Sequence, residues 1–120
     1  MKPYQDARVE GEKLAKQYAE LEKVDQVDFY NGLEGYYSVL GHNKKQEAIA
    51  VLIEKNEHKI YVYQLDKGIS QDKAATISRE KGASDIDKVT FGRYQDKPIW
   101  EVKSGNQYYL VDFETGAVIQ

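Results

Sequence analysis

The apolar positions near the start of the chain recur with the period of an α-helix. They follow one another at spacings of four, three, four and three residues, at Ala7, Gly11, Leu14, Tyr18 and Leu21. At about 3.6 residues per turn these positions form one stripe, and charged residues fill the remaining positions. Pro3 suits a first turn, where its missing N–H costs nothing. The pattern fades at about Val24, so we predict an amphipathic helix up to that residue.

Beyond this helix the apolar residues alternate with polar ones, which is the period of a β-strand. The alternation covers 27–29 and 37–39, and Asn31-Gly32 is a turn signal between them. The next run, 48–53, is entirely apolar and rich in β-branched residues, so we predict a strand that is buried on both faces. A polar turn then leads to its hairpin partner at 60–63.

A second helix is predicted over 70–81. Ser70 is a suitable N-cap because its hydroxyl can accept a hydrogen bond from a first-turn N–H, and Asp72 suits the positive end of the helix dipole. Gly82 fits the left-handed position that ends a helix. Three strands and a last short one are predicted after it, at 86–94, 98–103, 107–113 and Val118-Ile119. We expect Trp100, on the second of these strands, to be buried.

The two halves of the chain repeat one another. Asp25-Gln26-Val27-Asp28-Phe29 corresponds to Asp87-Lys88-Val89-Thr90-Phe91, which lies 62 residues further along, at 87–91 instead of 25–29. Each half is a helix followed by an antiparallel meander, so the predicted fold class is α+β, with one unit over 1–66 and a second over 67–120. Because a unit of this size covers its apolar faces poorly alone, we expect the two to pack together, with Val51 and Ile53 or their neighbours buried between layers.

Composition excludes several classes of function. A chain of 120 residues is one ordinary domain in size, which excludes a large multidomain enzyme. The net charge of -3 argues against a nucleic-acid-binding protein, because binding to phosphates needs a basic face. The chain has no cysteine, so thiolate zinc sites, disulfides and cysteine nucleophiles are excluded. No stretch approaches the ~20 apolar residues that span a bilayer.

Candidate catalytic residues are few. His42, in a polar loop, and His58, in a hairpin turn, have no acidic or metal-binding partner close in the sequence, so we interpret them as solvated. Asp85 and Asp87 would share one strand face, as a pair of hydrolase carboxylates does, but a solvated strand edge explains them equally well. The chain lacks a glycine-rich phosphate loop, a G-x-S-x-G elbow and an H-E-x-x-H motif. We therefore predict no enzymatic activity, no cofactor and no metal site.

Tyrosine is unusually abundant, with ten among the 120 residues. Aromatic residues are favoured in strands, so core packing explains many of them. A partner surface is the alternative, because tyrosine offers a large rigid ring with a polar tip. Neighbours such as Tyr108 and Tyr109 point to opposite faces of a strand, so some tyrosines must face outward. The candidate protein-binding residues are Tyr36, Tyr61, Tyr63 and Tyr108.

Three segments of the second half resemble a PepSY domain. They are 69–75, which opens a helix with Ile-Ser, 97–102, which contains an aromatic-Glu-Val strand, and 109–119, which contains an Asp-x-x-Thr-Gly turn. In that turn Asp112 and Thr115 can hydrogen-bond to the backbone, while Gly116 takes a positive φ. The resemblance implies a cystatin-like unit of one helix and an antiparallel sheet.

Two such units after an amphipathic helix resemble the YpmB-type envelope proteins of Firmicutes, the TseB-like cell wall elongation regulators. The resemblance covers essentially the whole chain and implies a non-enzymatic role in peptidoglycan synthesis, through contact with a penicillin-binding transpeptidase. It also implies an extracytoplasmic domain on an N-terminal membrane helix that is missing here; a cytoplasmic protein that begins at Met1 is the alternative. The first unit departs from the PepSY pattern, because 53–57 lacks the Asp-x-x-Thr-Gly turn.

Two further functions stay open at this point. PepSY domains of metallopeptidase propeptides inhibit a peptidase, which requires an exposed segment that enters the active-site cleft. The loops 41–46 and 94–98 are short and polar, which does not favour that function. A carrier of a small ligand would need a concave apolar pocket.

Overall fold

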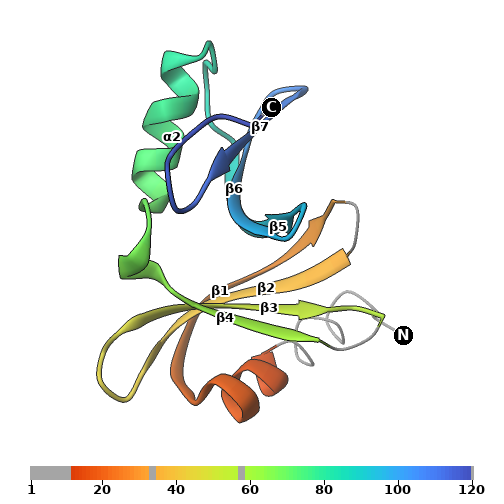
Figure 1. Ribbon diagram of the computed structural model, residues 1–120, viewed down its shortest axis with the longest axis vertical. Helices are drawn as coiled ribbons and strands as arrows, with labels where there is room; N and C mark the ends of the chain where they lie inside the picture. Colours follow the sequence, from red (N-terminus) through yellow and green to blue (C-terminus); the bar gives the residue numbers. More distant parts are fainter. Residues whose placement is uncertain (1–11, 33–34, 57–58, 120) are drawn as a thin grey trace. The chain divides into compact units, whose positions relative to one another are not determined.

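A computed structural model describes residues 12–32, 35–56 and 59–119, which belong to two compact units, 1–65 and 66–120 (Figure 1). The first unit has a helical segment, residues 12–19, followed by a four-stranded antiparallel sheet. The second has a short 3-10 turn, a helix and a three-stranded antiparallel sheet. The fold class is α+β, as the sequence predicts.

The first sheet is a meander in which each strand pairs with the next one along the chain. Its strands are β1 (Leu21–Asn31), β2 (Gly35–Asn43), β3 (Ala48–Glu54) and β4 (Ile60–Gln64), in the order β1-β2-β3-β4. All four strands predicted for this half are present, and β1 and β2 extend well beyond the short alternating segments that predicted them.

The helical segment covers one face of this sheet. Ala15 packs in a buried cluster with Val39, Val51 and Ile53. The register places Val39 opposite Val51, so side chains of neighbouring strands meet on this face. Leu52 points to the opposite face and is also fully buried. The central strand β3 is therefore buried on both faces, as its apolar run predicts.

The first helix ends earlier than its periodicity predicts. Helical geometry stops at residue 19, Glu20 has a positive φ of 55°, and Leu21 already begins β1. A residue in the left-handed region cannot continue a right-handed helix. The expected continuation to Val24 is therefore wrong.

The buried stripe of the helical segment also differs from the expected one. Tyr18 is exposed, whereas Ala15 is completely buried and Leu14 is partly buried. Ala15, with Leu14 and Ala19 beside it, therefore forms the side of the helical segment that packs against the sheet, and Tyr18 faces solvent. Pro3, Ala7 and Gly11 lie outside the described residues.

The second unit opens with η1 (Leu65–Lys67) and α2 (Gln71–Glu80). The backbone N–H of Lys73 donates to the Ser70 hydroxyl at 3.0 Å, so Ser70 is the N-cap that the sequence predicts. Gly82 follows the helix with a φ of 113°, a conformation that glycine adopts without strain.

The second sheet is a three-stranded meander that α2 covers. Its strands are β5 (Lys88–Tyr94), β6 (Lys97–Ser104) and β7 (Gln107–Asp112), and α2 contacts all three. The last predicted strand is reduced to a single bridge between Val118 and Val111.

The turn after β7 has the hydrogen bonds that its motif predicts. The Asp112 carboxylate accepts from the backbone N–H groups of Glu114 and Thr115, at 2.8 and 3.1 Å. The Thr115 hydroxyl accepts from the backbone N–H of Ala117 at 3.1 Å, and Gly116 has a φ of 82°. Side chains therefore stabilise this turn, which returns the chain along β7.

Trp100 lies at the centre of the second core and is 1% exposed, which confirms its predicted burial. Its ring centroid is 5.0 Å from that of Phe91 and 6.4 Å from that of Phe113, both in edge-on orientations. The indole N–H donates to the backbone oxygen of Ile69 at 3.0 Å. Trp100 thus joins β6 to the segment that precedes α2.

Each unit places a helix before a meander, but the two differ in detail. One sheet has four strands and the other has three. The corresponding residues Phe29 and Phe91 lie on the first strand of their sheets, yet Phe29 is exposed and Phe91 is fully buried. The repetition of two equivalent units, and their packing together, therefore stay predictions.

Candidate functional site

Three of the four candidate tyrosines lie on one face of the first sheet. The register pairs Tyr36 with Glu54 on β3, and it pairs Tyr61 and Tyr63 of β4 with Leu52 and Ala50. Tyr30 of β1 joins this face because it pairs with Tyr36. We call the face that carries Tyr30, Tyr36, Tyr61 and Tyr63 the tyrosine face.

The position of Tyr36 corrects an expectation. Its side chain is 3% exposed, because its ring packs beside those of Tyr30 and Tyr61, with centroids 6.4 and 6.2 Å away. Tyr36 is therefore a packed residue and not an exposed anchor. Tyr61 and Tyr63, on the edge strand β4, are half-buried and retain accessible surface.

Tyr108 belongs to the second unit and is 54% exposed on β7. Its neighbour Tyr109 points to the other face, is half-buried and donates its hydroxyl to the side chain of Gln107 at 2.8 Å. The four candidates therefore do not lie on one sheet, and Tyr61 and Tyr63 are the pair that the fold brings together with accessible surface.

Two exposed apolar residues on the strands of the first sheet, Phe29 and Val62, were not among the candidates. Phe29 on β1 and Val62 on β4 both lie on the helix-covered face of the first sheet, at positions where they stay exposed. The Phe29 ring lies 5.7 Å from that of Tyr37, and the Lys55 ammonium is 5.5 Å from the Phe29 centroid. A signal for Val62 is present in the sequence, because the strand Ile-Tyr-Val-Tyr-Gln is apolar on both faces.

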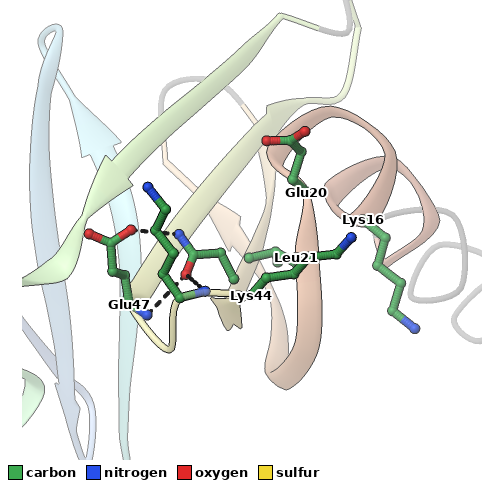
Figure 2. A pocket seen from close by; sticks show the side chains of 7 residues that line it. Lys16, Glu20, Leu21, Lys44 and Glu47 are labelled. Carbon is green, nitrogen blue, oxygen red and sulfur yellow. Dashed lines mark hydrogen bonds between the residues drawn. The ribbon is translucent and has the colours of Figure 1, made fainter.

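A polar hollow opens beside the end of the helical segment. It is lined by Lys16, Glu20, Leu21, Asn43, Lys44, Lys45 and Glu47. Asn43 holds together the loop on one side of the hollow, because its side-chain oxygen accepts from the backbone N–H groups of Lys45 and Glu47, both at 3.0 Å. Figure 2 shows Glu47 and Lys16 on opposite sides of this hollow. Six of its seven lining residues are polar or charged, whereas small-molecule pockets are lined mostly by apolar side chains, so this hollow does not support a ligand-carrier function.

The histidine and carboxylate candidates make surface and turn contacts. His42 lies on β2, not in a loop, and its Nδ1 is 2.6 Å from the Asp25 carboxylate, an acidic partner that the sequence does not predict. Asp85 and Asp87 both precede β5, so the expected pair on a strand face is wrong. The Asp87 carboxylate accepts from the backbone N–H of Gly105 at 2.8 Å and thereby stabilises the turn between β6 and β7.

Glu101 is an ionisable residue whose protonation the fold changes. It lies in the middle of β6, half-buried between Thr90 of β5 and Leu110 of β7. Burial raises the pKa of Glu101 above its ordinary value of 4.5, and the positive charge of Lys88 partly opposes this rise.

Two other classes of site find no support in the part of the chain that the structure describes. Within 12–32, 35–56 and 59–119, no three histidine or acidic side chains come together in a way that holds a metal ion. In the same residues, no helix has the length and apolar character needed to cross a membrane. His58 lies outside the described residues.

Similarity to known proteins adds a biological context. Residues 10–54 match the family model of the cell wall elongation regulator TseB-like domain. Over 114 residues the chain is 39% identical to a Bacillus subtilis (strain 168) protein named "Probable cell wall elongation regulator TseB". The matched region covers 88% of this chain and 70% of that protein. The chain also resembles the solved structure of the YpmB protein from Bacillus subtilis, with a TM-score of 0.80 and 34% identity over 94% of both chains. The resemblance to TseB-like proteins is confirmed, while the PepSY resemblance of the second half stays a prediction.

Proposed function

Because the chain belongs to the TseB-like family of cell wall elongation regulators, we propose that it acts by binding a penicillin-binding transpeptidase and not by catalysis. In this proposal the domain regulates peptidoglycan synthesis, and with it cell elongation, in a Gram-positive bacterium. It works outside the cell, where the wall is assembled, and an N-terminal membrane helix holds it there. The absence of cysteine suits that location, since the fold does not depend on the redox state around it.

The observation that carries the proposal is the surface of β4. Its half-buried Tyr61 and Tyr63 lie on the tyrosine face, and its exposed Val62 points to the opposite face. Partly buried aromatic rings on a rigid strand are typical of binding hot spots. Charged residues are depleted in the centre of protein interfaces, and β4 contains none.

The contacts of the polar candidates support binding over catalysis. The Asp87 carboxylate is used by the turn at Gly105, and the His42 imidazole is paired with Asp25 at the surface. The Asp87 carboxylate therefore already has a structural partner in this turn.

The test is a direct binding measurement. The chain is immobilised, and the purified extracellular regions of the penicillin-binding transpeptidases of Bacillus subtilis are passed over it in biolayer interferometry. We expect one of them to bind, and we expect a Tyr61→Ser, Tyr63→Ser variant to lose about tenfold or more of the affinity, as hot-spot removal does. Tyr18→Ser, at an exposed ring of the helical segment, is the matched control and should keep its affinity.

Circular dichroism of each variant confirms that it is folded before binding is compared. Failure of every transpeptidase to bind the unmodified chain would contradict the proposed partner. Equal affinity of the double serine variant would contradict the proposed surface. Inhibition of a secreted metallopeptidase without transpeptidase binding would favour the peptidase-inhibitor function instead.

A further inference from the structure

The strand β4 forms an outer edge of the first sheet. Within the residues that the structure describes, the strand order β1-β2-β3-β4 leaves β4 paired on one side only, with β3. Its five residues, Ile60–Gln64, include no charge and no proline, and its pairing with β3 shows no bulge. Charges, prolines and bulges are the usual features that prevent an edge strand from pairing with another chain.

The direction of the β4 backbone groups follows from one hydrogen bond. The backbone N–H of Glu54 donates to the backbone oxygen of Lys59 at 2.8 Å, so the positions 54 and 59 form a hydrogen-bonded pair. Pairs of this kind alternate along an antiparallel ladder with pairs whose N–H and C=O groups point away from each other. Ile60, Val62 and Gln64 therefore direct their backbone groups outward, and the Val62 side chain is 48% exposed.

The edge strand β1, at the other side of the same sheet, is protected against pairing with a further strand. Its register with β2 is interrupted twice, between Leu21 and Lys23 and between Val24 and Gln26. Charged side chains also follow one another along it, at Glu22, Lys23, Asp25 and Asp28. Bulges and charges of this kind oppose the addition of a further strand.

Some backbone groups at each edge of the second sheet are already hydrogen-bonded to other parts of the chain. Along β7, the N–H of Asp112 donates to the oxygen of Ala117 at 2.8 Å, and the N–H of Ile119 donates to the oxygen of Leu110 at 2.7 Å. Along β5, the side-chain amide of Gln71 donates to the backbone oxygen of Val89 at 2.9 Å. Among the edges that the structure describes, β4 is thus the one without such protection.

We propose that β4 binds an extended segment of the partner protein, which joins the first sheet as a fifth strand. Another extended backbone is the ligand whose donors and acceptors match the outward groups of Ile60, Val62 and Gln64. Because Val62 lies on one face and Tyr61 and Tyr63 lie on the other, the segment carries apolar or hydroxyl side chains on both of its faces. This inference rests on the proposed function for the identity of the partner.

The composition of β4 limits the kind of segment that it can bind. None of its five residues is charged. The expected ligand is therefore an uncharged, strand-forming segment.

The test uses photo-crosslinking in cells that make the full chain. A benzoylphenylalanine replaces Gln64, whose side chain is exposed next to the outward backbone groups, and the crosslinked protein and segment are identified by mass spectrometry. Val62→Pro is combined with this probe, because proline removes the outward N–H of Val62 without removing a β3–β4 hydrogen bond. Val62→Thr is the matched control, since it keeps the N–H and the β-branched shape.

We expect a crosslink to an extended segment of a transpeptidase, reduced about tenfold or more by Val62→Pro and less than about twofold by Val62→Thr. The same dependence with another identified protein would support strand addition and contradict the proposed partner. A crosslink between two copies of this chain, a crosslink that Val62→Pro does not reduce, or no crosslink would overturn the inference. If Val62→Pro does not fold, Val62→Lys replaces it, because a lysine on an edge strand blocks pairing while the backbone stays intact.

Discussion

At the scale of single residues, Trp100 is the largest fully buried side chain that the structure describes in the second core. It combines the edge-on contacts with Phe91 and Phe113 with the hydrogen bond to Ile69. Trp100→Ala should lower the free energy of unfolding by about 3 to 5 kcal/mol, because it leaves a large cavity. Urea titration followed by circular dichroism measures this change. Trp100→Phe keeps an aromatic ring and should cost clearly less than the alanine change, while an alanine cost below ~1 kcal/mol would contradict a core role.

Glu101 gives a second prediction at this scale, in the pH dependence of stability. Burial raises its pKa in the folded chain above the ordinary 4.5, so the folded state holds this proton more tightly than the unfolded state does. The contribution of Glu101 to stability is therefore full below pH 4.5 and is lost as the pH rises through the raised pKa. Glu101→Gln should increase the free energy of unfolding at pH 7, and the difference should vanish at pH values below 4.5.

Denaturant titrations of both proteins across this pH range test the Glu101 prediction. Glu114→Gln, at an exposed turn position, controls for the change in net charge. Equal stability of Glu101→Gln and the unmodified chain at pH 7 would show that burial of this carboxyl carries no cost. The effect is expected to be modest, because water still screens a half-buried side chain.

At the scale of elements, α2 depends on its N-cap. The Ser70 hydroxyl accepts the N–H of Lys73, which otherwise lacks an intrahelical partner in the first turn. Ser70→Ala should destabilise the chain by about 1 kcal/mol, and thermal unfolding measures the loss. Ser70→Asp keeps an acceptor at the positive end of the helix and should stay close to the unmodified chain. An unchanged melting temperature for Ser70→Ala would mean that the cap does not stabilise α2.

The edges of the two sheets show how elements with similar sequences acquire different roles. The edge of β7 is paired by the residues that follow its turn, and the edge of β1 is bulged and charged. The edge of β4 has neither feature, although its sequence is as strand-forming as those of the core strands. A strand-forming segment at a sheet edge therefore becomes a candidate binding site because of its neighbours, which the segment itself does not specify.

At the scale of the whole molecule, each unit has about half of the 120 residues. Domains of about 60 residues bury only about 60% of their unfolded surface and are marginally stable alone. From this size argument we predict that the units unfold together. Trp100 is the single tryptophan and belongs to the second unit, so its fluorescence follows that unit, whereas far-UV circular dichroism follows both. The two urea transitions should coincide, and separate midpoints would show that the units unfold independently.

The parts of this protein that the sequence determines by itself depend on contacts between residues close along the chain. The capped start of α2 at Ser70, the Asp112 turn with Gly116, and the apolar run of β3 follow from local chemistry, and the structure has all of them. Burial of Trp100 was also predictable, because a large apolar ring on an alternating strand is seldom exposed in a small domain.

The tertiary structure decided which faces and edges are covered. Tyr36 is buried and Tyr61 is half-exposed, although the sequence treats them alike, because Tyr36 lies on an inner strand between two tyrosine rings and Tyr61 lies on the edge. The pairing of His42 with Asp25 joins residues from different strands in the same way. Periodicity indicates which side chains share a face, but accessibility depends on what distant parts of the chain place over that face, and this is set only when the sheet is assembled.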